Sequence, residues 1–326
     1  MKRSVIARMR ITELSGKNLA QVVAAWNATL VHDPLTASRF RDVFLNDPNY
    51  QPDGVSVAEG DHGAVLGFSA CYVRETVAGK DGLGGQWEFN WGYLKGFFVV
   101  EGDEESAIAT SLLAAAEAHC AGAGKEQLRV TEYACSYVFP GLDIRYERLR
   151  AILCEHGYRD LRTLEDVAVD LRDPGLPSRL ARAQRRVGTS AEVVTWRPEL
   201  LPAMQAFVAQ SYEPQWFPSG WEEELSRPLD HVLILRRGEE IVGWAQYHPS
   251  RPRASFGPIL VLDPMRGHGY GSLLLLECMV RARQAGAERM AAGWANTGFY
   301  VANGWQITRR YAVLAKSLSG ESRREA

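Results

Sequence analysis

The chain has 326 residues, of which 46% are hydrophobic and 23% charged, and these globular values exclude disorder over most of its length. Its formal net charge of -2 disfavours nucleic acid as a partner, because nucleic-acid-binding proteins usually carry a basic surplus. The sequence has no run of about eighteen apolar residues and no apolar core behind its basic N-terminus, so we expect neither a membrane span nor a signal peptide.

The cysteines are odd in number, widely spaced and without a CxxC pair. They are Cys71, Cys120, Cys135, Cys154 and Cys278. This usage is typical of reduced thiols, and it argues against a disulfide framework or a zinc site. We therefore expect a cytoplasmic protein with no metal and no membrane partner.

The first half of the chain alternates short strands with amphipathic helices. Its predicted strands cover residues 10–14, 55–59, 64–73, 88–100, 127–131 and 166–171. Its predicted helices cover residues 17–30, 37–46, 103–121 and 143–156. Acidic residues open the third helix at its positive end, and Gly157 ends the fourth as a glycine C-cap.

A linker is predicted at residues 172–178, where two prolines and a glycine fall within seven positions. A short basic helix over residues 179–187 follows it. Its arginines stand at positions 179, 182, 185 and 186. Such a run fits a solvated helix face better than a nucleic-acid patch.

The second half repeats the order of elements found in the first. Its predicted strands cover residues 191–196, 232–236, 241–247, 254–261, 289–292 and 306–315. Its predicted helices cover residues 199–210, 222–226, 269–285 and 297–303. The repeated order indicates a duplication, and hence a mixed-sheet α/β fold with two tandem domains. We place the domains at residues 1–172 and 190–326, with the linker and basic helix at 173–189.

A glycine-rich turn joins the strand ending at Val261 to the long helix of the second half. Glycines at 267, 269 and 271 allow consecutive N–H groups to point inward at a helix N-terminus, which suits a diphosphate. The turn lacks the Gly-Lys-Ser/Thr ending of a Walker loop and the spacing of a dinucleotide fingerprint. By itself it also fits a plain turn between a strand and a helix.

A second motif, about thirty residues further on, narrows the interpretation. It consists of Phe299, Tyr300, Gly304 and Trp305, and the glycine-rich turn supplies Arg266, Gly269 and Gly271. Together they resemble the two motifs of the GNAT acetyltransferase superfamily, Arg/Gln-x-x-Gly-x-Gly/Ala and Phe-Tyr-x-x-x-Gly-Phe. The resemblance covers roughly residues 190–316.

The resemblance implies an acetyl-CoA-dependent enzyme that transfers acetyl to the amine of a small molecule by direct attack. Pantetheine would lie between two splayed strands on the backbone of Ile259, Leu260 and Val261, where an N–H near Leu260 or Val261 would hold the oxyanion. The diphosphate would lie on Arg266, Gly267, His268, Gly269, Tyr270, Gly271 and Ser272. Tyr300 matches the family's general-acid position, and it also fits a tyrosine packed on the core.

The sequence departs from the family pattern at two places. Many members carry an asparagine seven residues before the tyrosine, where this chain has Gly293, and Asn296 is the nearby substitute. Many also carry a glutamate on the central strand as general base, and here that strand has no carboxylate. His248, which we also place on the acceptor side, and Glu222 to Glu224 are candidates that equally fit surface residues. A water chain or an amine of lowered pKa would also serve.

The acceptor site of this family is usually shaped by the region between the first two helices. In this chain that region is rich in aromatic residues, namely Tyr212, Trp216, Phe217 and Trp221. Two interpretations stay open, a binding cleft and a small hydrophobic cluster under the loop.

The first half resembles a degenerate copy of the same domain. Aligning its leucine pair with that of the second half puts Glu105 at the position of Arg266, and Ile108 and Thr110 replace two glycines. The acidic side chain repels phosphate and the branched ones block the backbone, so we expect this half not to bind CoA. The arrangement resembles bacterial tandem GNAT proteins, including the mycothiol synthase type.

Three functions follow as hypotheses. The first is an N-acetyltransferase acting on a small amine, as a monomer or homodimer. The second is a non-catalytic acyl-CoA sensor or regulatory protein, because the base glutamate is missing. The third, a modifier of nucleic acid, is disfavoured by the near-neutral charge.

Overall fold

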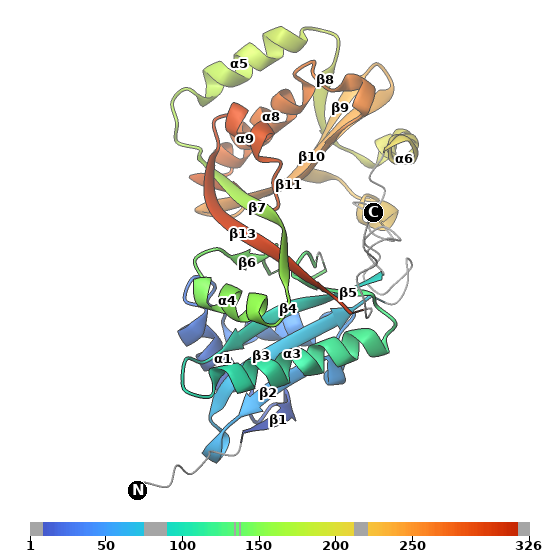
Figure 1. The fold of residues 1–326 in the computed structure, drawn as a ribbon. Helices are drawn as coiled ribbons and strands as arrows, with labels where there is room; N and C mark the ends of the chain where they lie inside the picture. The colour runs from blue at the N-terminus through green and yellow to red at the C-terminus, as the bar shows by residue number, and fades with distance from the viewer. Residues whose placement is uncertain (1–8, 75–89, 134, 137, 212–220, 319–326) are drawn as a thin grey trace, which may run out of the picture. The chain divides into compact units, whose positions relative to one another are not determined.

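The computed structural model describes residues 9–74, 90–133, 135–136, 138–211 and 221–318. The chain forms two compact units (Figure 1). The first unit comprises Met1–Leu164 and Tyr311–Ala326, and the second comprises Glu165–Arg310.

The first unit is built on a sheet of mostly antiparallel strands. In spatial order the sheet contains β1 (Arg10–Glu13), β2 (Val55–Glu59), β3 (Val65–Val73), β4 (Trp91–Val99), β5 (Gln127–Val130) and the end of β13 (Gln306–Ser317). Only β4 and β5 pair in parallel among these strands. The two-residue strand β6 (Leu142–Asp143) pairs with β13.

The helices of the first unit bury one apolar face each. They are α1 (Leu19–Thr29), α2 (Ala37–Phe40), which continues as a π-helical turn over Arg41–Leu45, α3 (Glu105–Gly122) and α4 (Glu147–Glu155). The indole of Trp26 on α1 is fully buried and meets the rings of Phe40, Phe44 and Phe68 at centroid distances of 5.9, 5.4 and 6.2 Å. Such edge-on aromatic packing stabilises this core beyond simple area burial.

The second unit has a sheet of the same design. In spatial order the sheet contains β8 (Glu192–Trp196), β9 (Leu229–Arg237), β10 (Glu240–His248), β11 (Arg253–Val261), β12 (Arg289–Ala292) and the end of β7 (Arg159–Asp170). Here β11 and β12 form the parallel pair, and the other pairs among these strands are antiparallel.

The long helix α8 (Tyr270–Gln284) covers the sheet of the second unit. Its apolar side chains, including Leu274 and Met279, are fully buried against β9, β10 and β11. Helix α5 (Leu176–Val187) packs along α8 (Figure 1), and the remaining helices are α6 (Leu201–Gln210), α7 (Trp221–Glu224) and α9 (Thr297–Ala302). The structure thus confirms the predicted mixed α/β fold.

Strand β7, which ends the first half of the chain, completes the sheet of the second unit. Strand β13, which ends the second half, completes the sheet of the first unit. In the second unit Ala292 of β12 pairs with Val167 of β7, and in the first unit Val130 of β5 pairs with Leu314 of β13. Hydrophobic periodicity identifies a strand but not its neighbour. Because the two halves have the same order of elements, the sequence does not show that β7 and β13 are exchanged between the two sheets.

Several boundaries differ from the sequence-based prediction. Helix α5 begins at Leu176, inside the predicted linker at residues 172–178. Two other differences have local reasons. Strand β7 begins at Arg159 instead of 166. The prediction missed residues 159–163 because they are exposed and mostly polar, with no apolar alternation to mark a strand. Helix α4 begins at Glu147 instead of 143, because Leu142 and Asp143 pair with β13 as β6. None of the helices in the described part of the chain is long and apolar enough to cross a membrane.

Candidate functional site

Strands β11 and β12 diverge after a short parallel stretch in the second unit. Their pairing runs from Arg253 opposite Arg289 to Ser255 opposite Ala291, and β11 then continues to Val261. Between Ala245 and Tyr247 of β10 the register with β11 shifts by one residue, which places a bulge near Gly257 and Pro258. The geometry is the splay at a bulge that the family resemblance implied.

The diverging part of β11 presents backbone groups on the edge that faces away from β10. The N–H of Leu262 donates to the carbonyl of Val242 at 3.0 Å, and antiparallel pairing alternates sides with each residue. The backbone of Leu260 therefore points toward β10, and that of Ile259 and Val261 points to the opposite edge. The N–H of Leu260, expected from the sequence as one possible oxyanion donor, thus faces away from the divergence. In agreement, the carbonyl of Val261 accepts a hydrogen bond from Arg266 Nε at 3.3 Å.

The glycine-rich turn has the backbone conformation that its sequence predicts. Gly267 and Gly269 have φ angles of 81° and 89°, a region that side chains disfavour. Gly269 is the N-cap of α8, and the first helical hydrogen bond runs from Leu273 N–H to its carbonyl at 3.0 Å. The N–H groups of residues 270–272 therefore precede the helical ladder at its positive end, an arrangement that suits an anion.

Two exposed side chains flank this turn. Arg266 forms an ion pair with Asp263 at 2.8 Å, and His268 Nδ1 lies 2.8 Å from the carbonyl of Arg266. The imidazole of His268 stacks on the ring of Tyr270 with centroids 6.1 Å apart. The turn is therefore held by its own side chains without a residue covering the N–H groups of α8 from within this loop.

Tyr300 lies on α9, next to the start of the divergence. Its ring meets Phe256 at a centroid distance of 6.1 Å and Trp305 at 5.1 Å, and the residue is 6% exposed. No hydrogen bond joins its hydroxyl to another described residue. Burial raises the pKa of Tyr300 to about 12, so the hydroxyl keeps its proton at neutral pH.

A carboxylate that the sequence analysis missed fixes the loop before α9. Glu165 of β7 accepts a hydrogen bond from Thr297 Oγ1 at 2.6 Å and from Arg310 Nε at 2.8 Å, and its carbonyl accepts from Ala295 N–H at 3.1 Å. The hydrogen bond from Thr297 contributes most to lowering the pKa of Glu165, and Arg310 adds to it. Only the fold reveals this contact, because Glu165 and Thr297 lie 132 residues apart.

The other predicted site residues fall into three groups. Asn296 is the exposed N-cap of α9, with no capping hydrogen bond from its side chain. His248 ends β10 opposite Ser255, with its ring 5.7 Å from that of His231. Tyr212, Trp216 and Phe217 lie outside the described residues, as does the side chain of Trp221 at the start of α7. The acceptor side therefore stays a prediction.

The first unit lacks the glycine turn at the equivalent place. Helix α3 already begins at Glu105, the residue aligned with Arg266, so the backbone there is helical. The carboxylate of Glu105 pairs with Arg148, whose Nη2 also donates to the carbonyl of Val99 at 2.7 Å. Helix α3 therefore begins without the positive-φ glycines that precede α8.

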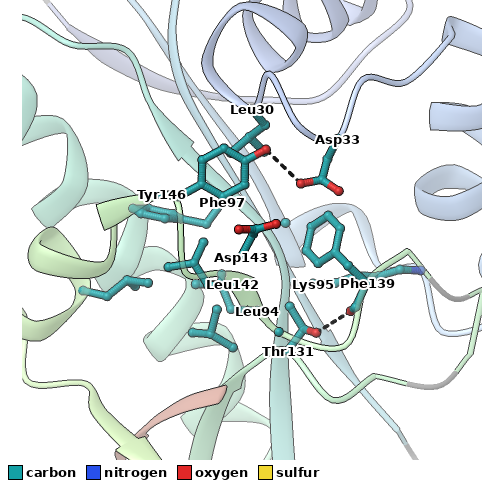
Figure 2. A pocket seen from close by; sticks show the side chains of 14 residues that line it. Leu30, Asp33, Leu94, Lys95, Phe97, Thr131, Phe139, Leu142, Asp143 and Tyr146 are labelled. Atoms are coloured by element: carbon teal, nitrogen blue, oxygen red, sulfur yellow. Dashed lines mark hydrogen bonds between the residues drawn. The ribbon is translucent and has the colours of Figure 1, made fainter. Parts of the chain in front are cut away.

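Strands β4 and β5 of the first unit also diverge, after Tyr93 opposite Arg129. Figure 2 shows the cavity at this place, where Asp143 and Phe139 approach the strands from the later part of the unit. The Tyr146 hydroxyl donates to Asp33 at 2.8 Å on its rim. The unit's own side chains thus line the space between its diverging strands.

Comparisons with known proteins agree with this geometry. Residues 195–305 match the family model described as the acetyltransferase (GNAT) family. No curated protein matches the chain in a sequence comparison. Among the described residues, no cluster of three His, Cys, Asp or Glu side chains could hold a metal ion.

Solved structures with the same fold cover nearly the whole chain. The GCN5-related glucosamine N-acetyltransferase region of a fungal multi-domain GH3 β-N-acetylglucosaminidase has a TM-score of 0.77 and 16% identity, covering 95% of this chain and 38% of that one. A GCN5-related N-acetyltransferase from Sphaerobacter thermophilus has a TM-score of 0.66 and 15% identity, covering 95% of this chain and 96% of that one.

A tandem GNAT protein from the clavulanic acid biosynthesis pathway has a TM-score of 0.63 and 14% identity, covering 97% of this chain and 100% of that one. At such identities the likeness concerns the fold alone. It confirms the predicted tandem GNAT architecture. This chain spans little more than a third of the fungal enzyme, 38% of its length.

Proposed function

Because residues 195–305 form a domain of the GNAT acetyltransferase family, which transfers acyl groups from acyl-CoA, we propose that the second unit acetylates the amine of a small molecule. The observation that carries the proposal is the divergence of β11 from β12, followed directly by the glycine turn into α8. A strand edge with no neighbouring strand among the described residues and a helix N-terminus without a side-chain cap then follow each other along one path. That path suits an elongated molecule with an amide-bearing arm and a diphosphate.

The residues present fit acetyl-CoA. The outward-facing backbone groups of Ile259 and Val261 would pair with the amides of the pantetheine arm, as a further strand does at a sheet edge. The N–H groups of residues 270–272 would hold the diphosphate. Arg266 would border it from the turn, and Asn296 at the start of α9 would contact the pantetheine arm.

Acetyl-CoA supplies a thioester that an amine can attack directly. The N–H of Ile259 or Val261 would donate a hydrogen bond to the carbonyl oxygen as the new C–N bond forms. The Tyr300 hydroxyl would give its proton to the sulfur as the C–S bond breaks, and its raised pKa keeps that proton available. The amine's surplus proton would leave to water.

The first test is release of free thiol from acetyl-CoA against a panel of small amines. The panel should include amino sugars, because the similar fungal region is a glucosamine N-acetyltransferase, together with amino acids and aminoglycosides. Turnover with one class supports the proposal. Tight acetyl-CoA binding with no thiol release for any amine would support the acyl-CoA-binding alternative instead.

Matched variants assign the active unit. Arg266→Glu should weaken acetyl-CoA binding, and Glu105→Ala at the aligned position should leave it unchanged. Equal losses from both would contradict the assignment of one active unit. Gly269→Val is a poor probe, because its φ of 89° would strain any side chain.

A further inference from the structure

The basic helix α5 brings one of its arginines onto the glycine turn of the second unit. Arg186 Nη2 donates to the carbonyl of Gly267 at 3.3 Å. A Cβ placed on Gly269 would lie 3.2 Å from both Cδ and Nε of Arg186. The side chain therefore crosses the turn directly before α8. Since the two residues joined by the hydrogen bond are 81 apart in the chain, no local sequence pattern indicates this contact.

Helix α5 holds this arginine in a fixed place. Leu176 and Val187, at its two ends, are buried in the core of the second unit. Gln184 Nε2 donates to Glu277 of α8 at 3.0 Å, and Arg179 Nη1 donates to the carbonyl of Asn303 at 3.0 Å. Figure 1 shows α5 alongside α8. The helix is therefore a packed element of this unit and not only a solvated basic face.

The charge of Arg186 is not neutralised in the described part of the chain. Its hydrogen-bond partner is the neutral carbonyl of Gly267, and no described carboxylate pairs with it. Its neighbour at the turn, Arg266, is balanced by Asp263. A cation next to the N-terminus of α8 opposes the helix dipole, whereas an anion between them would be attracted by both. The arrangement is unfavourable alone and favourable with a phosphate in place.

We propose that Arg186 binds the diphosphate of the acyl-CoA from the side of α5. This inference rests on the proposed function and adds to it a residue that precedes the segment matched by the family model. A guanidinium presents paired donors to phosphate oxygens, which makes arginine suited to this role. The turn supplies N–H groups from one side, and Arg186 supplies the positive charge from the other.

The test measures dissociation constants by calorimetry for acetyl-CoA, acetyl-dephospho-CoA and S-acetylpantetheine. Arg186→Gln should weaken acetyl-CoA and acetyl-dephospho-CoA about tenfold, the usual scale for losing one charge-assisted contact, and leave S-acetylpantetheine unchanged. Arg185→Gln is the matched control, because this exposed neighbour has no contact with the turn among the described residues, and it should change none of the three. Arg186→Lys should recover part of the loss.

Four results would overturn the assignment of Arg186 alone. They are unchanged binding by Arg186→Gln, an equal loss from Arg185→Gln, a loss that extends to S-acetylpantetheine, and a loss confined to the ligand with the 3′-phosphate. A wild-type protein that binds none of the three ligands would overturn the proposed function together with this inference. Unchanged thermal unfolding of Arg186→Gln separates a binding defect from a folding defect.

Discussion

Replacing Glu165 with alanine should loosen the start of α9 and slow catalysis. The carboxylate accepts hydrogen bonds from Thr297 Oγ1 at 2.6 Å and Arg310 Nε at 2.8 Å, and its side chain is 19% exposed. Hydrogen bonds to a charged group contribute about 1.5–3 kcal/mol when shielded, and exposed ion pairs only about 0.2–1 kcal/mol. Because the Arg310 side chain is 52% exposed, we assign most of the effect to Thr297. We expect the free energy of unfolding of Glu165→Ala to fall by about 2–3 kcal/mol.

The functional effect follows from the position of Tyr300, one helical turn after Thr297. A shift of about 1 Å in a catalytic group can cost about a hundredfold in rate, so kcat for Glu165→Ala should fall between about tenfold and a hundredfold. The KM for acetyl-CoA should change less. Glu165→Gln keeps an acceptor oxygen for Thr297 and should recover much of the rate.

Urea unfolding and amine-dependent thiol release measure the two effects. The control is Asp170→Ala, a carboxylate on the same strand that pairs with an exposed arginine and should change neither. Because contacts lower the pKa of Glu165, its contribution is present above the carboxyl's ordinary pKa and disappears as the pH falls through the lowered value. Equal effects from Glu165→Ala and Asp170→Ala would refute the reasoning.

Three further predictions concern other parts of the molecule. Tyr300→Phe should lower kcat about a hundredfold with little change in acetyl-CoA affinity. Because the pKa of Tyr300 is raised to about 12, a pH-rate profile of the wild-type protein should show no alkaline fall from this residue below about pH 10. Asp47→Ala should destabilise the first unit by about 3–5 kcal/mol in urea unfolding, because Lys95 would be left as a buried unpaired charge. The Lys95 side chain is 2% exposed and lies 2.7 Å from Asp47. Replacing both Asp47 and Lys95 with apolar residues should recover most of the lost stability. A chain ending at Arg310 should show faster hydrogen exchange in β5, which loses its neighbour β13, and unchanged protection there would contradict the strand exchange.

The local sequence pattern was sufficient to predict segments whose structure depends on their own residues. The apolar run of α8 predicted a helix that begins within one residue of its observed start, and the glycines before it predicted a turn, in which Gly267 and Gly269 have positive φ. The resemblance added the second motif, and the structure placed Tyr300 beside the diverging strands. These features could be predicted because hydrophobic period and glycine conformation act over a few neighbouring residues.

Features that depend on distant neighbours could not be predicted. Nothing in the sequence distinguishes the arginines of α5 from one another. Only the packing of α5 on α8 brings Arg186, and not Arg185, to the glycine turn. Likewise Glu165 is an ordinary acidic residue until β7 places it against Thr297. In both cases the chemistry arises from a contact that no local pattern encodes.

The amino-acid sequence by itself determined the order of strands and helices, the doubling of that order, and the glycine turn that only the second half carries before its long helix. The tertiary structure alone decided which strand completes which sheet and which charged side chains reach the turn and α9. The physical reason is that burial and backbone conformation are dictated residue by residue. A strand edge or a charged side chain instead has many chemically similar possible partners, and which of them it contacts depends on the tertiary structure.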